Sequence, residues 1–248
     1  MDGIVAVTID FWNTLVDETG APERRAERRD ALVEALAAVG RTVDEAQFDA
    51  AQQATLTYFQ HHWLGQRRTP HARELVGVML AELGAELPDE SLDRVAHVFA
   101  QGVLSHPPRL LPGAREALAE LADRARLAII SDTAFSPGAV LRALLEREGV
   151  AGHFTSFVFS DETGVAKPEP AAFARALDAL GAEPGRAVHV GDLERTDIVG
   201  ARGAGMRSIL FRAREHLHAL AEEETEADAV VAGWHEVAPA VEALLGRG

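Results

Sequence analysis

Short β-rich runs that alternate with helical stretches constrain the fold of this chain most strongly. The first run, at residues 4–9, is nearly all apolar, as in strands that are buried on both faces of a sheet. Five more follow late in the chain, at 127–130, 157–159, 187–190, 208–211 and 229–231. Helical stretches such as 112–123 and 170–180 separate most of them. This alternation predicts right-handed βαβ units, and hence an α/β fold with a mainly parallel sheet.

A long segment without strands interrupts the alternation after the first run. Between about residue 21 and residue 105, apolar residues recur at helical spacing, and we expect four amphipathic helices. Breaks at Gly40, at Gly65 and across 84–88 separate the helices. Asp89 is expected to cap the N-terminus of the last helix, since its carboxylate can accept from free backbone N–H groups.

The position of this helical segment predicts two domains. Residues 1–18 together with 107–248 are expected to form the α/β core. Residues 19–106 are expected to form an all-helical domain inserted after the first strand. An insertion at this place suggests a cap over a site in the core.

The charge balance excludes several classes of partner. The chain carries 24 Lys and Arg against 39 Asp and Glu, a formal charge of -15, so phosphate backbones and anionic lipids would repel it. The densest basic cluster, residues 23–30, alternates in sign and is expected to be a solvated helix face, including Arg24 and Arg28. We therefore expect no nucleic-acid and no membrane partner. The oligomeric state stays open, a homodimer included.

Cysteine and histidine usage narrows the chemistry further. The chain has no cysteine, which excludes disulfides, thiolate catalysis and Cys-based metal sites. His61 and His62, like His216 and His218, point to different helix faces within each pair, so they are expected at the surface. The chain starts without a basic region and contains no apolar run near 18 residues. A cytoplasmic protein is the resulting expectation.

Polar residues stand where four of the expected strands end. In open parallel sheets, ligands bind beyond the carboxyl ends of the strands. The residues concerned are Asp10, Trp12 and Thr14 after the first strand; Ser131, Asp132 and Thr133 after the second; Lys167 after the third; and Asp192 and Asp197 after the fourth. We expect these side chains to meet at one edge of the sheet.

In this order, these residues resemble the four motifs of the haloacid dehalogenase superfamily. The resemblance covers residues 1–20 and about 107–212, and the Gly164-x-x-Lys167-Pro168 segment makes it specific. The helical insertion is similar to the cap that one branch of the superfamily places after strand one. The resemblance implies a Rossmann-like parallel sheet core with an inserted all-helical cap, and a hydrolase that acts on a small anionic substrate, most readily a phosphorylated one.

The resemblance also implies a role for each motif residue. Asp10 would attack phosphorus and form an acyl phosphate, which splits one hard step into two. Lys167 would neutralise the charge that builds up there. Thr14 and Ser131 would offer hydroxyl groups to phosphoryl oxygens, and the neighbouring Trp12, Asp132 and Thr133 would line the substrate site.

A magnesium ion is the implied cofactor. Mg²⁺ prefers hard oxygen ligands in octahedral geometry. The carboxylates of Asp10 and Asp192 and the backbone carbonyl of Trp12 would supply such ligands. Asp197 would hold the outer shell or position a water.

Trp12 departs from the phosphatase pattern. Phosphatases of this superfamily carry a second Asp two residues after the nucleophile, and this Asp protonates the leaving alcohol. An indole cannot do so, and general acid–base catalysis is typically worth about 10²–10⁴ in rate. Alkyl phosphates should therefore turn over slowly, whereas acyl or aryl phosphates should suffer less.

The same departure keeps two other functions open. Dehalogenases of the superfamily carry an aromatic residue at this position, so a 2-haloacid dehalogenase that forms an ester on Asp10 is the rival. Asp192 beside Asp10 without a cation would only bring like charges together, which favours Mg²⁺ and phosphoryl chemistry. Asp197 matches both activities equally well. A non-catalytic member that binds a phosphorylated ligand is the third alternative.

Four of the motif residues also have a purely structural alternative. Asp10 can simply end its strand, Lys167 can be a solvated lysine, and Ser131 can cap a turn. Asp197 can stabilise a helix N-terminus. The order in which these residues follow one another along the chain favours an active site over these structural alternatives.

Overall fold

The computed structural model describes residues 5–212 and 224–246, which divide into two compact units. The first unit is Met1–Glu18, Arg109–Asp132 and Leu145–Gly248, and the second is Thr19–Pro108 and Thr133–Leu144. His216 and His218 lie outside the described residues. Each unit is considered by itself below.

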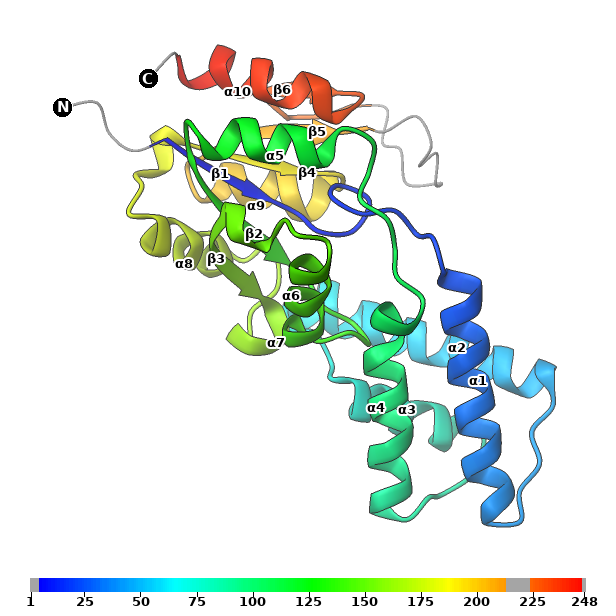
Figure 1. The fold of residues 1–248 in the computed structure, drawn as a ribbon. Coiled ribbons are helices and arrows are strands. Elements are labelled where there is room, and N and C mark those ends of the chain that lie inside the picture. Colours follow the sequence, from blue (N-terminus) through cyan, green and yellow to red (C-terminus); the bar gives the residue numbers. More distant parts are fainter. Residues whose placement is uncertain (1–4, 213–223, 247–248) are drawn as a thin grey trace. The chain divides into compact units, whose positions relative to one another are not determined.

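A six-stranded parallel sheet forms the centre of the first unit (Figure 1). The strands are β1 (Ala6–Ile9), β2 (Arg126–Ser131), β3 (Phe154–Phe159), β4 (Ala187–Gly191), β5 (Arg207–Phe211) and β6 (Ala229–Val231). They lie in the order β3-β2-β1-β4-β5-β6, and every neighbouring pair is parallel. The α/β fold with a Rossmann-like parallel sheet is therefore confirmed.

Helices cover both faces of this sheet (Figure 1). The longer ones are α5 (Ala114–Ala122), α8 (Pro170–Leu180) and α10 (Val237–Leu245), and the shorter ones α7 (Ser160–Thr163) and α9 (Val199–Gly203). Single turns occur at η2 (Ala151–His153), η3 (Pro184–Arg186), η4 (Glu194–Ile198) and η5 (Trp234–Glu236). α6 (Gly138–Arg147) has residues in both units.

The packing of α8 follows from its helical period. Phe173, Ala176, Leu177 and Leu180 are spaced to share one face, and all four are buried. They pack with alanines and larger apolar residues of β1, β2, β3 and β4 in one core cluster. α9 completes this layer, because Gly200 lets it approach α8 closely.

Gly200→Ala is expected to destabilise the first unit. A Cβ at Gly200 would lie 2.4 Å from Cε2 of Phe173 and 3.0 Å from Cα of Pro168. Relieving such overpacking typically costs about 1–3 kcal/mol of unfolding free energy. Gly203→Ala is the matched control in the same helix: its Cβ would meet nothing within 4 Å, and it should be neutral or slightly stabilising. Urea unfolding of both variants measures the difference, and equal stabilities would contradict the packing argument.

The four helices predicted between residues 21 and 105 are present in the second unit, which also contains the first part of α6. They are α1 (Ala21–Ala38), α2 (Glu45–Gln60), α3 (Ala72–Glu82) and α4 (Asp89–Ser105), with a π-helical turn, η1 (His61–Gly65), after α2. Their apolar faces meet in one core that includes Leu32, Leu36, Met79 and Phe99. The prediction for Asp89 was wrong. Pro88 is the N-cap of α4, Asp89 is the first residue of the helix, and no side chain that the structure describes makes a capping hydrogen bond at this end.

Two arginines of α1 contradict the prediction of a fully solvated charged face. Arg24 is buried, and its Nη1 donates to the carbonyls of Thr19 and His106, each at 2.7 Å. Arg28 Nη2 donates to the Phe99 carbonyl at 3.1 Å, and its guanidinium lies 4.5 Å from the ring centre of Phe135. Both residues are turned inward, where backbone carbonyls accept from their guanidinium groups and, for Arg28, aromatic rings pack against it.

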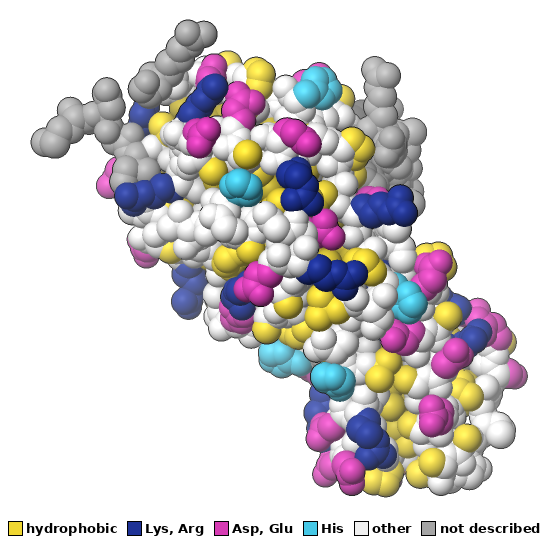
Figure 2. Space-filling model, in the orientation of Figure 1, with side chains coloured by type: hydrophobic (Ala, Val, Ile, Leu, Met, Phe, Trp, Pro, Cys, Tyr) yellow, Lys and Arg dark blue, Asp and Glu magenta, His cyan; other side chains and the backbone are white. Residues whose placement is uncertain are grey.

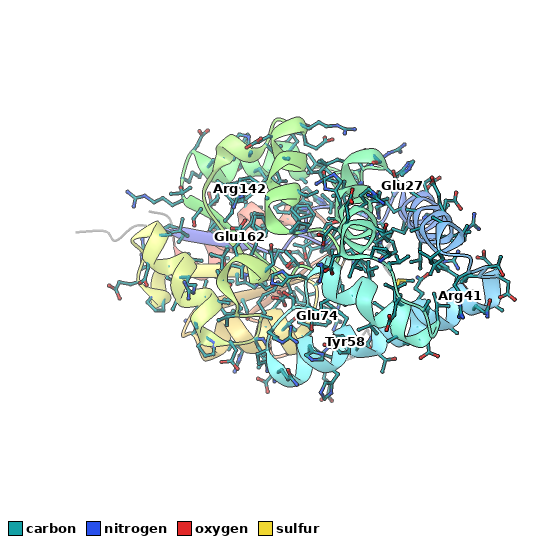
Figure 3. All side chains as sticks on the ribbon, turned by 90° about the horizontal axis from the view of Figure 1, so that it is seen from below. Glu27, Arg41, Tyr58, Glu74, Arg142 and Glu162 are labelled. Atoms are coloured by element: carbon teal, nitrogen blue, oxygen red, sulfur yellow. The ribbon has the colours of Figure 1, made fainter. Side chains whose placement is uncertain are left out.

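Other charged side chains of the second unit do pair near the surface. Figure 2 shows Lys, Arg, Asp and Glu intermixed on the face that it presents. Arg68 donates to both carboxylate oxygens of Glu74, and the Tyr58 hydroxyl adds a 2.6 Å bond to Glu74 (Figure 3). These hydrogen bonds lower the pKa of Glu74 to about 2, and the bonds from Arg68 contribute most. His62 is buried instead of exposed, and its ring lies 4.0 Å from that of Tyr58.

Helices of membrane-spanning length and polarity do not occur in the part of the chain that the structure describes.

Candidate active site

The candidate site lies at the carboxyl ends of three adjacent strands of the first unit. Asp10 follows β1 directly, Ser131 is the last residue of β2, and Gly191 is the last residue of β4. β1 lies between β2 and β4, and the Asp10 N–H extends the ladder by donating to the Val190 carbonyl at 2.9 Å. Parallel pairing in this order brings the motif residues together, because equivalent strand ends share one edge.

Lys167 connects two of the predicted carboxylates. Its Nζ donates to Oδ1 of Asp10 and, at 2.7 Å, to Oδ1 of Asp197, and its side chain is 3% exposed. Burial alone would lower the pKa of Lys167, but the charges of Asp10, Asp197 and Asp132 outweigh it and raise this pKa. The ammonium is therefore charged, and a solvated lysine is excluded.

Asp197 is held from several sides. Its Oδ2 accepts from the Leu193 N–H at 3.0 Å and from the Thr196 hydroxyl at 3.3 Å. Burial would raise the pKa of Asp197, but the Lys167 charge and the bond from His189 lower it overall. The carboxyl group sits directly over Gly191, where a Cβ would come within 2.3 Å of the Asp197 Cγ. Only glycine leaves room for the carboxylate in this position.

The site holds more carboxylates than one lysine can neutralise. Burial raises the pKa of Asp10 to about 7 in spite of Lys167. Burial, followed by the charges of Asp10 and Asp197, raises the pKa of Asp192 well above its usual range. Charged together, these groups repel one another. A divalent cation bound to Asp10 and Asp192 would relieve that repulsion, so these oxygen donors fit a hard cation such as Mg²⁺.

The cation fit depends on two carboxylates and a carbonyl. Across residues 5–212 and 224–246, no group of three or more His, Asp or Glu side chains is arranged to hold a metal. The predicted set of Asp10, Asp192 and the Trp12 carbonyl contains only two such side chains. Mg²⁺ commonly binds through one or two carboxylates and keeps several waters, so this small donor set suits it.

Three buried polar atoms near Asp10 lack hydrogen-bond partners among the described residues. They are Oδ1 of Asn13, Oγ1 of Thr14 and Oγ of Ser131. Buried polar atoms are rarely left unpaired unless a ligand or water satisfies them. Ser131 therefore does not cap a turn here, and neither hydroxyl has a partner in the described part of the chain that would compete with a ligand's oxygen atoms. The binding roles expected of Thr14 and Ser131 stay predictions.

The loop after β1 has a defined backbone geometry. Asn13 is in the left-handed region at φ 58, which asparagine tolerates better than most residues. Its N–H donates to the Val16 carbonyl at 2.8 Å, and the Trp234 indole donates to the Thr14 carbonyl at 2.8 Å. Trp12 is half-buried in this loop, and its ring lies edge-on to Phe11 at 5.2 Å.

Two predicted substrate residues make other contacts in the structure. Oδ1 of Asp132 accepts from the Lys167 backbone N–H at 3.0 Å, which anchors the lysine loop. Thr133 belongs to the second unit, where its hydroxyl lies 3.4 Å from that of Thr69. Asn13 and His189 were not predicted. Asn13 stands inside the first motif, but His189 is the third residue of an apolar strand, where sequence alone cannot show its partners.

Comparison with known proteins gives a consistent picture. The family model described as "Hydrolase: haloacid dehalogenase-like hydrolase" matches residues 4–205. A phosphoserine phosphatase of Thermus thermophilus is 41% identical over 147 residues, 59% of this chain and 55% of that protein. A glyceraldehyde 3-phosphate phosphatase of Pyrococcus abyssi is 36% identical over 105 residues, 42% of this chain and 43% of that protein. The chain thus matches about half the length of these curated relatives.

A solved structure extends the likeness over nearly the whole chain. The 2-haloacid dehalogenase of Pseudomonas syringae is 26% identical, with a TM-score of 0.69, and the match covers 97% of this chain and 98% of that one. The two activities named among these relatives are the same pair that Trp12 leaves open.

Proposed function

Because the chain belongs to the haloacid dehalogenase-like hydrolases, we propose that it is a Mg²⁺-dependent phosphohydrolase or phosphoryl-transfer enzyme with Asp10 as its nucleophile. The observation that carries this proposal is the buried Lys167 ammonium bound to Asp10 and Asp197, with Asp192 as a further, unneutralised carboxylate. Phosphatases among the curated relatives support it.

The protein's own residues suffice to outline two steps. An Asp10 oxygen attacks phosphorus, and the bond to the leaving oxygen breaks with its electron pair on that oxygen. This forms an aspartyl phosphate, which water then attacks at phosphorus to release phosphate and regenerate the carboxylate. Lys167 keeps the Asp10 carboxylate oriented and balances its charge, while the hydroxyls of Thr14 and Ser131 donate to phosphoryl oxygens.

Asp10, Asp192 and the Trp12 carbonyl would hold the Mg²⁺ ion. When bound, the ion supplies positive charge to the phosphoryl oxygens and to the crowded carboxylates. Asp197 is already occupied by Lys167, His189 and the Leu193 N–H, which suits the outer shell that the sequence predicts for it.

The substrate in this proposal is a small phosphorylated molecule with a good leaving group. Trp12 offers no proton to a departing alkoxide, so acyl and aryl phosphates are favoured over alkyl phosphates. A cytoplasmic location stays a prediction, and the oligomeric state stays open.

Hydrolysis of p-nitrophenyl phosphate is expected to require Mg²⁺. Removal of the ion with EDTA should lower kcat/KM by about 10²-fold or more, since metal stabilisation of transition-state charge is worth several kcal/mol. Added Mg²⁺ should restore the rate, whereas Na⁺ at equal ionic strength should not. Turnover that is insensitive to the chelator would contradict the proposal.

A 2-haloacid dehalogenase is the second candidate. Two observations favour it: the aromatic Trp12 and the 26% identity to such an enzyme over nearly the full chain. Here an Asp10 oxygen would attack the halogen-bearing carbon, halide would leave with its electron pair, and water would hydrolyse the ester. Chloride release from 2-chloropropionate without added metal would establish this activity. Its absence with and without Mg²⁺ would remove it.

A further inference from the structure

His189, in the middle of the sheet, contacts the carboxylate of Asp197 in the candidate site. His189 lies on β4 and is fully buried. Its Nε2 is 3.0 Å from Oδ1 of Asp197, and its Nδ1 is 2.8 Å from Oγ1 of Thr8 on β1. The ring meets Phe173 edge to face at 5.1 Å and 84°. Both ring nitrogens therefore have one defined partner each.

The partners determine which nitrogen carries the proton. Oδ1 of Asp197 also accepts from Lys167, so this carboxylate is ionised and can only accept a bond from His189. Nε2 therefore carries the hydrogen, and Nδ1 accepts from the Thr8 hydroxyl, whose other neighbour, the Val188 carbonyl, is 3.5 Å away. Burial lowers the pKa of His189, consistent with a neutral ring.

We propose that His189 is a positioning residue, whose Nε2–H holds Asp197 in the orientation that keeps the Lys167 ammonium against Asp10. This inference rests on the proposed function of Asp10. Oδ1 of Asp197 accepts hydrogen bonds from both His189 and Lys167. His189 therefore fixes the position of the second carboxylate that Lys167 binds. Gly191 leaves Asp197 free to sit there, and Leu193 and Thr196 hold its other oxygen.

Two amide variants separate this role from simple packing. In His189→Gln the amide nitrogen occupies the place of Nε2 and can still donate to Asp197. In His189→Asn the amide reaches only the place of Nδ1, beside Thr8. Both lose the ring that packs on Phe173, so both should lose similar thermal stability.

The expected result is a split in kcat between the two variants. His189→Asn should lower kcat for p-nitrophenyl phosphate by about 10–100-fold, as the loss of an outer-shell partner typically does, with KM little changed. His189→Gln should retain most of the wild-type kcat. Equal losses in both variants, or wild-type kcat in both, would overturn the proposal.

Nuclear magnetic resonance gives a readout that needs no turnover. The ¹⁵N signals of the His189 ring, assigned by their loss in His189→Gln, should report the neutral Nε2–H form. The Lys167 ammonium signal should persist in wild type and His189→Gln and shift or broaden in His189→Asn. An Nδ1–H form, or an unchanged ammonium signal in His189→Asn, would refute the positioning role. An inactive wild type with the expected signals would instead count against the proposed function alone.

Discussion

Asp10→Asn is expected to abolish phosphate-ester hydrolysis, with kcat reduced by about 10⁴-fold or more, because removing a covalent nucleophile leaves only binding and electrostatic effects. An amide cannot form the acyl phosphate. The fold should survive, since Lys167 keeps its bond to Asp197 and a buried carboxylate whose pKa is raised by burial is replaced by a neutral group. Steady-state kinetics with an aryl phosphate, together with a thermal melt, measure both outcomes.

Asp178→Asn is the matched control for this substitution. Asp178 is exposed on α8, away from the strand ends that carry the site, so the same chemical change there should leave kcat unaltered. Residual turnover in Asp10→Asn at more than a few per cent of wild type would mean that another group is the nucleophile. A collapse of the melting temperature would mean that the carboxylate is needed for folding.

Trp12→Asp is expected to raise alkyl phosphate hydrolysis by about 10²–10⁴-fold, the usual worth of general acid–base catalysis. The new carboxyl group would stand two residues after Asp10, the position at which phosphatases of the superfamily carry their acid. A protonated carboxyl group can donate to a departing alkoxide, which an indole cannot. Aryl phosphates should gain much less, because their leaving groups depart without a proton. Parallel assays of an alkyl and an aryl phosphate measure this contrast.

Trp12→Asn separates proton donation from a mere change of size. It removes the same indole and adds a side chain of almost the same shape as aspartate, but without an acidic proton. An equal gain in both variants would show that Trp12 limits the rate by blocking space. If Trp12→Asp leaves alkyl phosphate hydrolysis at background, the missing acid was not the limiting defect, and the dehalogenase alternative gains weight.

Local pattern explains what could be predicted of the fold. α8 begins and ends at 170 and 180, as expected from its helical spacing between Pro170 and Gly181. The predicted strands differ from the observed ones by at most three residues at either end within the described part. A strand that is buried on both faces is apolar in sequence, and a helix that packs on a sheet has apolar residues at helical spacing. Both the strands and α8 could therefore be located from local sequence.

The prediction for Asp89 shows the limit of such reasoning. The carboxylate next to a helix start has the right chemistry for a cap, but the helix begins one residue earlier than that assignment requires. Helix ends depend on the backbone conformation of the flanking residue, which side-chain chemistry alone does not determine. The same holds for Arg24 and Arg28, whose charges suggested solvent but whose partners are carbonyls from other helices and loops.

For the site, the sequence by itself determined which residues are the candidates: Asp10, Ser131, Lys167, Asp192 and Asp197 lie at or after the carboxyl ends of strands, and parallel strands bring such ends together. Only the tertiary structure decided how they pair. Lys167 binds Asp10 across 157 residues of chain, and His189 binds Thr8 across 181. Hydrogen bonds and buried charges depend on distances between such remote atoms, and no local periodicity encodes those distances. Asp10 was therefore visible as a candidate nucleophile, whereas His189 became visible as a partner of Asp197 only in the folded chain.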